Sequence, residues 1–146
     1  MDWSIIWTVI KTSVLPSFFA IITFCVIHKF KTKDDIKNHM RLMLFDINKI
    51  RENLKNHRKN KSIPIYKINI LPDWRNTFYI INHKLQPLEA EKILNFYFEL
   101  ERLLIVIEQY KKQQDLNKFF PVFLFGSEKI LEIDLKDVLK KLENKS

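Results

Sequence analysis

The hydrophobic pattern divides this chain into a continuous apolar stretch near the N-terminus and, after residue 30, apolar residues at helical spacings. Residues 5–27 carry a single charge, Lys11. At 1.5 Å per residue, a helix of this length crosses a hydrocarbon core of about 30 Å. Trp3 and Trp7 stand at its leading end, where indole rings settle at the level of the lipid headgroups. We therefore predict a transmembrane helix within residues 1–30.

The charges that flank this stretch predict its orientation. Lys29, Lys31 and Lys33 follow it, whereas only Asp2 and the terminal amine precede it. Because Lys and Arg are in excess on the cytoplasmic side of a span, we expect the N-terminus outside and residues 31–146 in the cytoplasm. A cleavable signal peptide fits less well, since no basic segment precedes the apolar run and no A-x-A site follows it.

Residues 31–146 predict one mainly α-helical domain, and its first helix is expected to begin at Thr32. Thr32 is a suitable N-cap, with the acidic Asp35 three residues later. Six apolar residues then recur at alternating spacings of four and three, which is a heptad seam. The seam could pack within the domain or against a second copy; the first is favoured because a small helical domain needs such a stripe. These residues are Ile36, Met40, Met43, Ile47, Ile50 and Leu54.

The middle of the chain predicts a connector and a short helix. Residues 63–71 are rich in β-branched side chains, but Pro64 and Pro72 limit them to an edge strand or an extended connector. Asp73 is then placed to cap a helix over residues 74–83.

The C-terminal half predicts the longest helix after the span, residues 87–113, with a proline in its first turn. This helix is apolar almost all round, so it is either the central core helix or one face of it is an oligomer contact. An apolar run at 119–125 and an amphipathic helix through Leu142 follow. A short β-hairpin near residues 119–133 is the competing interpretation. The residues of this helix that are expected to face the core are Ile130, Leu131, Leu135, Val138, Leu139 and Leu142.

Composition narrows the classes of function. Lys and Arg outnumber Asp and Glu 25 to 17. This excess of positive charge favours binding to an anionic membrane surface or to nucleic acid, and the charge alone does not distinguish the two. The one cysteine, Cys25, lies in the predicted span, so disulfides within the chain and cysteine-based zinc sites are excluded. A single glycine excludes phosphate-cradling loops. The four histidines are never three or four residues apart, so we expect no metal and no cofactor.

Small and hydroxyl residues recur along one side of the predicted membrane helix. A helix side of this kind either packs closely against another helix in lipid or lines a water-filled path. Lys11 lies about two turns into the span, where it is either functional or snorkels to the outer headgroups. The predicted pore or helix-interface residues are Lys11, Thr12, Pro16, Ala20 and Thr23.

Arg51 and His57 match the R-x(4–6)-H pattern of higher-eukaryote-and-prokaryote nucleotide-binding (HEPN) domains, many of which are metal-independent ribonucleases. In that chemistry the histidine acts as base or acid on a 2′-hydroxyl and the arginine binds the phosphate. Six residues along a helix correspond to a rotation of about 240°, so the two side chains point apart unless the helix ends between them. We therefore predict that the pair is not catalytic and that the protein is not an enzyme.

The single N-terminal span, the small basic helical domain and the Arg51–His57 spacing together resemble the small membrane accessory proteins of type VI-B CRISPR systems, which carry a divergent HEPN-like domain. The resemblance implies a homo-oligomeric pore in the bacterial inner membrane. It also implies that the pore, through permeability rather than RNA cleavage, strengthens phage defence by an RNA-guided RNA nuclease encoded nearby. Two alternatives remain open: a membrane-tethered HEPN-type ribonuclease, and a monomeric membrane anchor or adaptor that recruits a partner.

Overall fold

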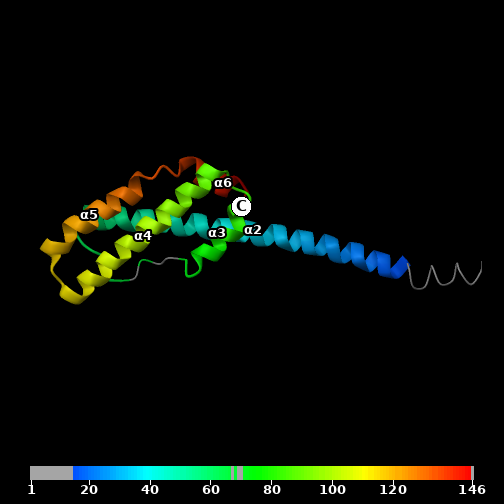
Figure 1. The fold of residues 1–146 in the computed structure, drawn as a ribbon, viewed down its shortest axis with the longest axis horizontal. Helices are drawn as coiled ribbons and strands as arrows, with labels where there is room; N and C mark the ends of the chain where they lie inside the picture. Colours follow the sequence, from blue (N-terminus) through cyan, green and yellow to red (C-terminus); the bar gives the residue numbers. More distant parts are fainter. Residues whose placement is uncertain (1–14, 67, 69–70, 146) are drawn as a thin grey trace, which may run out of the picture. The chain divides into compact units, whose positions relative to one another are not determined.

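The computed structural model describes residues 15–66, 68 and 71–145, and its regular structure within them is helical (Figure 1). The chain separates into two compact units, Met1–Ile36 and Lys37–Ser146. The prediction of a mainly α-helical fold is confirmed. The helices are α2 (Leu15–Lys59), α3 (Trp74–Asn82), α4 (Pro87–Gln113), α5 (Leu116–Glu132) and α6 (Lys136–Lys145).

The first unit contributes the N-terminal part of α2. Ile22, Phe24 and Val26 expose their side chains there, Phe24 by 70%. Among the residues that the structure describes, none of the helices is both long and apolar enough to cross a membrane. The predicted span begins at residue 5, and its portion before Leu15 lies outside the described residues.

Helix α2 continues through the point where the sequence predicts a helix start. The expected N-cap at Thr32 is wrong, because α2 runs without interruption from Leu15 to Lys59. Residues 28–36 contain neither glycine nor proline, and their lysines favour helix, so nothing in this stretch ends the preceding helix. Five residues of the heptad seam pack within the second unit, as expected: Met40, Met43, Ile47, Ile50 and Leu54 are buried there. Ile36, the last residue of the first unit, is half-buried.

The connector and α3 agree with the sequence, with the strand alternative excluded for the described residues. Residues 63–66, 68 and 71 form no strand, and Ile63 and Ile68 are buried. Helix α3 begins after Asp73, whose carboxylate accepts a hydrogen bond from the Asn76 backbone N–H at 3.3 Å.

The possible hairpin near residues 119–133 is wrong, because this segment is the helix α5. Its buried residues Phe119, Phe123 and Ile130 follow helical spacing, and Asp115 caps the helix by accepting a 3.1 Å hydrogen bond from the Lys118 N–H. The proline inside α5 removes one backbone hydrogen bond, and burial of the apolar stripe outweighs that loss.

The single amphipathic helix expected through Leu142 is interrupted at residues 133–135, which separate α5 from α6. Asp134 starts the second helix by accepting a 3.2 Å hydrogen bond from the Lys136 N–H. Of the six positions expected to face inward, Ile130, Leu135, Val138 and Leu142 are buried, and Leu131 and Leu139 are half-buried.

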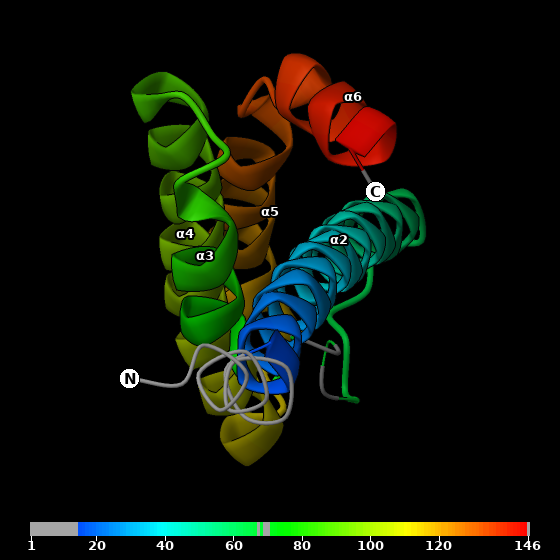
Figure 2. The same ribbon diagram turned by 90° about the vertical axis from the view of Figure 1, so that its right-hand side faces the viewer.

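Helix α4 contributes several side chains to the core of the second unit and packs along α5 (Figure 2). Gly126, the only glycine of the chain, allows this close approach. A Cβ atom added to Gly126 would lie 2.9 Å from Leu103 Cδ1. The α4 side chains in the core are Ile93, Phe96, Tyr97, Leu100, Leu103 and Ile107.

Candidate functional site

Arg51 holds the end of α5. Its guanidinium group donates to the carbonyl oxygens of Ile133 at 3.1 Å and Leu131 at 3.2 Å. The last carbonyls of a helix have no partner within the helix, so a basic side chain placed there satisfies them. This arrangement gives Arg51 a structural role between α2 and the turn that precedes α6.

His57 closes the turn that follows α2. Its Nδ1 atom lies 2.9 Å from the Ser62 hydroxyl, and the Ser62 N–H donates to the His57 carbonyl at 3.0 Å. Lys61 completes the turn with a left-handed φ of 48°. Partial burial lowers the pKa of His57 from 6.5, so its imidazole is neutral at neutral pH.

The structure places Arg51 and His57 against different partners. They lie on one uninterrupted helix, six residues apart, and each binds its own partner. A cleavage site would need both groups around the same phosphodiester. Among the described residues no group of three or more His, Cys, Asp or Glu could hold a metal ion.

The residues predicted to face a pore or a neighbouring helix are only partly described. Lys11 and Thr12 lie outside the described residues. Pro16 and Ala20 lie within α2, and the side chain of Thr23 is exposed. Their common face stays a prediction.

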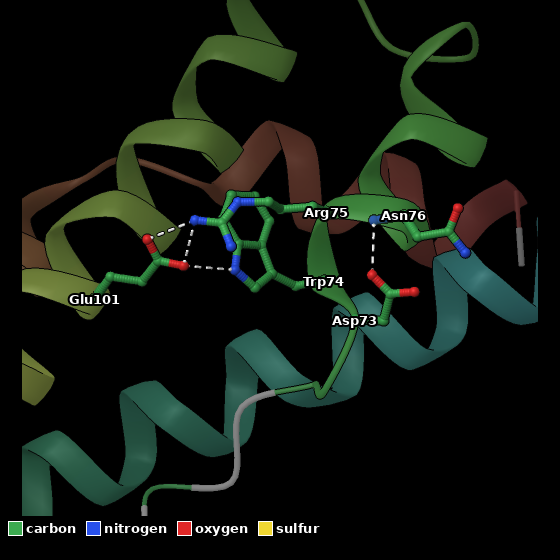
Figure 3. Close-up of polar contacts among 5 residues, drawn as sticks. All are labelled: Asp73, Trp74, Arg75, Asn76 and Glu101. Carbon is green, nitrogen blue, oxygen red and sulfur yellow. Dashed lines mark hydrogen bonds and ion pairs between the residues drawn. The ribbon is translucent and has the colours of Figure 1, made fainter.

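A layered aromatic and charged cluster joins α3 to α4 (Figure 3). The Trp74 indole stacks on the Tyr97 ring at 4.6 Å between centroids, with 6° between the planes. The Arg75 guanidinium lies 4.8 Å from the Trp74 ring. Glu101 accepts from Trp74 Nε1 at 3.1 Å and from Arg75 at 2.8 Å, so one carboxylate fixes both side chains.

Asp46 forms the buried polar centre beneath this cluster. Its carboxylate accepts hydrogen bonds from the Tyr97 hydroxyl at 2.8 Å and from the Leu71 backbone N–H at 3.1 Å. Burial raises the pKa of Asp46, and the two hydrogen bonds and Lys49 oppose the shift only in part. The pKa of Tyr97 is also raised, by burial first and then by the Asp46 charge. The pair connects α2, α4 and the 60–73 connector.

Sequence reasoning missed Asp46 and Tyr97 as a pair. A usable signal was present in α2, since Asp46 lies between Met43 and Ile50 at the three-and-four spacing of the buried seam. An acidic residue on a buried helix face needs a polar partner from another element. The spacing could not say which residue that partner is.

Two neighbouring hollows lie along α4 and are here together called the α3–α4 groove. One measures about 530 Å³ and the other about 340 Å³, and Asn95 and Phe98 line both. Its main apolar residues are Phe78, Leu85, Leu94, Phe98 and Ile105. Its charged residues are Glu91, Glu99, Glu101 and Arg102, of which Glu99 pairs with Arg102 and Glu101 with Arg75.

On α2 another exposed surface, here called the α2 outer face, carries Leu42 and Phe45. Phe45 is 65% exposed, and Lys49 Nζ lies 5.7 Å from its ring centroid. Arg41, also exposed, stands one turn before Phe45. This surface is therefore apolar with basic neighbours.

Comparison of the chain with known proteins finds no match among family models, curated proteins or solved structures. The resemblance to CRISPR membrane accessory proteins thus rests on the sequence features alone.

Proposed function

We propose that this protein is a single-pass inner-membrane protein that self-assembles through many copies into a pore. The proposal begins from the apolar stretch 5–27 and the lysines that follow it, which together have the length and charge bias of an N-out, C-in span.

The observation that supports this proposal best is the exposure of apolar side chains on the first unit. Ile22, Phe24 and Val26 are exposed on a helical segment of the expected span. Apolar side chains on a helix cost free energy in water and are stabilised in hydrocarbon. A lipid environment gives these residues the burial that the described chain does not provide.

Assembly follows from the number of spans. One helix cannot enclose a path for ions, so a pore made from a single-span chain needs several copies around an axis, with the same heterologous contact repeated until the ring closes. In the ring, one side of the helix would face neighbouring helices or the lumen. This side carries Lys11, Thr12, Pro16, Ala20 and Thr23. Lys11 would add positive charge near the outer mouth and disfavour cations there.

The biological setting of the proposal comes from the resemblance alone. Under it, the pore would act as an accessory effector that strengthens antiphage defence by an RNA-guided RNA nuclease, with membrane permeability as the output. The separate structural partners of Arg51 and His57 favour this output over RNA cleavage by the chain itself.

The test is the mass of the full-length protein in mild detergent, measured by light scattering during size-exclusion chromatography. The proposal expects one species at a fixed multiple of the monomer mass. A monomer would leave the membrane anchor or adaptor as the better function.

A further inference from the structure

The positive charge of the second unit is concentrated in one segment. Residues 37–146 hold 21 Lys and Arg against 14 Asp and Glu. Residues 49–67 alone hold seven of these cations and only one acid, Glu52, so the rest of the unit is nearly neutral. A charge excess gathered in one stretch of chain, rather than spread over the surface, is the electrostatic feature of a surface that binds a polyanion.

Three lysines of this segment are available to a partner. Arg51 and Arg58 are already engaged, the first with carbonyl oxygens at the end of α5 and the second in a 3.3 Å ion pair with that helix. Lys55, Lys59 and Lys61 are exposed, and within the described part of the chain they form no ion pair. The negative end of a helix favours cations in its last turn. That effect accounts for Lys59, but not for Lys55 one turn earlier or for Lys61 beyond the helix.

An exposed aromatic ring follows these lysines on the connector. The side chain of Tyr66 is 88% exposed, whereas Ile63 and Ile68 on either side of it are buried and anchor the connector to the unit. Five residues separate Tyr66 from Lys61, so their Cα atoms lie within about 18 Å of each other. A tyrosine ring held outward next to cations offers a flat surface on which a nucleic-acid base stacks.

The polar character of the same surface favours nucleic acid over a membrane. A surface that binds lipid carries apolar side chains that enter the headgroup region, and between residues 52 and 61 none of the exposed side chains is apolar. Ammonium and amide groups donate hydrogen bonds to phosphate and base oxygens. The exposed residues of this stretch are Glu52, Lys55, Asn56, Lys59, Asn60 and Lys61.

We propose that the end of α2 and the connector after it bind single-stranded nucleic acid. Lys55, Lys59 and Lys61 contact the phosphates, and Tyr66 stacks on a base. Binding of this kind is tolerant of sequence, because every base has a face that stacks and every nucleotide has a phosphate. It requires neither catalysis nor pore formation, so it goes beyond the proposed function and stands or falls separately from it.

Fluorescence anisotropy of a labelled single-stranded RNA tests this site, with the full-length protein in a non-ionic detergent. An RNA of about 16 nucleotides covers a typical single-strand site, and each titration is repeated over a series of salt concentrations. The first variant changes all three lysines to glutamine. Its matched control carries the same loss of charge on α4 and α6, at exposed lysines without a printed ion pair in the described part of the chain. The control changes to glutamine are at Lys112, Lys136 and Lys140.

Wild type is expected to bind the RNA, and the site variant to bind it about tenfold or more weakly. The slope of log K against log salt should fall by about 2, because three phosphate contacts on a single strand are lost. The control triple variant should keep both the affinity and the slope. Tyr66→Ala should weaken binding about fivefold or more, whereas Tyr79→Ala, at a tyrosine that is 80% exposed on α3, should not. Circular dichroism verifies that each variant is folded.

A wild type that does not bind RNA overturns the proposal, as does an equal loss of binding in the two triple variants. Unchanged binding by Tyr66→Ala overturns the stacking and with it the assignment to nucleic acid. The membrane is tested with a solvatochromic dye on Ile65→Cys in a chain that also carries Cys25→Ser, placed in nanodiscs of phosphatidylcholine with or without phosphatidylglycerol. The dye emission should respond to RNA and not to phosphatidylglycerol. A blue shift that needs only phosphatidylglycerol identifies the membrane surface as the partner and overturns the proposal.

Discussion

The Tyr97 hydroxyl donates a 2.8 Å hydrogen bond to the Asp46 carboxylate, and this buried contact joins α4 to α2. The carboxylate accepts a second bond from the Leu71 N–H. Burial is nevertheless the largest influence on the carboxyl group, so its pKa lies above the ordinary 3.8. The charged form of Asp46 therefore opposes folding more than the protonated form does.

The first prediction concerns the pH dependence that Asp46 creates. Because its folded-state pKa is raised, the folded protein binds this proton more tightly than the unfolded chain. The contribution of Asp46 to stability is thus most favourable below pH 3.8 and falls as pH rises through its folded pKa. Asp46→Asn removes the titration. Urea unfolding should show the stability of the variant relative to wild type rising from acidic to neutral pH, and a constant difference would contradict the raised pKa.

The second prediction concerns the other member of the pair. Tyr97→Phe keeps the ring stack with Trp74 but takes a hydrogen-bond donor from a buried carboxylate. Loss of such a partner costs about 1–3 kcal/mol. Tyr79→Phe is the control, because Tyr79 is 80% exposed, and it should change the free energy of unfolding by less than about 0.5 kcal/mol. Similar effects of the two substitutions would refute the buried contact.

The third prediction separates structure from catalysis at Arg51 and His57. Arg51→Ala leaves two carbonyl groups at the end of α5 without their donor and should lower the free energy of unfolding by about 1–3 kcal/mol. Arg51→Ala combined with His57→Ala should leave any cleavage of single-stranded RNA unchanged. If the double variant loses a robust wild-type ribonuclease activity while it stays folded, the tethered nuclease becomes the better function.

The fourth prediction tests the end of α4. Gln114 has a left-handed φ of 53° there, and its N–H donates to the Tyr110 carbonyl. Glycine adopts this conformation without the steric cost of a side chain, so Gln114→Gly should stabilise the fold by up to about 1 kcal/mol. The neighbouring Gln113 is the last helical residue, and Gln113→Gly should destabilise the fold. Thermal unfolding by circular dichroism distinguishes the two signs.

Local signals predicted α3 and α4 well. Asp73 and Pro87 mark the helix starts within a few residues, and the bounds of α4 match the prediction. The same kind of signal failed at Thr32, because an N-cap residue does not start a helix when the preceding residues are already helical. Between residues 119 and 133, burial of the apolar face of α5 stabilises the helix more than its internal proline destabilises it. The sequence shows the proline but not the helices against which that face packs.

The buried polar contacts were beyond sequence reasoning for a different reason. Asp46 and Tyr97 are 51 residues apart, and Arg51 and the Leu131 carbonyl are 80 apart. Helical spacing tells which face of a helix a residue occupies, but it does not tell which helix packs against that face. The Arg51–His57 spacing could be read from the sequence, but the separate partners of the two side chains could not.

The central claim, assembly into a pore, is tested most directly by dye leakage from liposomes that contain the full-length protein. Wild type should release the dye. Thr12→Leu combined with Ala20→Leu should change the leakage, because these residues face neighbours or the lumen in the proposed ring. Phe18→Ala combined with Ile22→Ala, on the lipid side, is the matched control and should leave leakage nearly unchanged. The account is contradicted if the wild-type liposomes retain their dye and the reconstituted protein is monomeric.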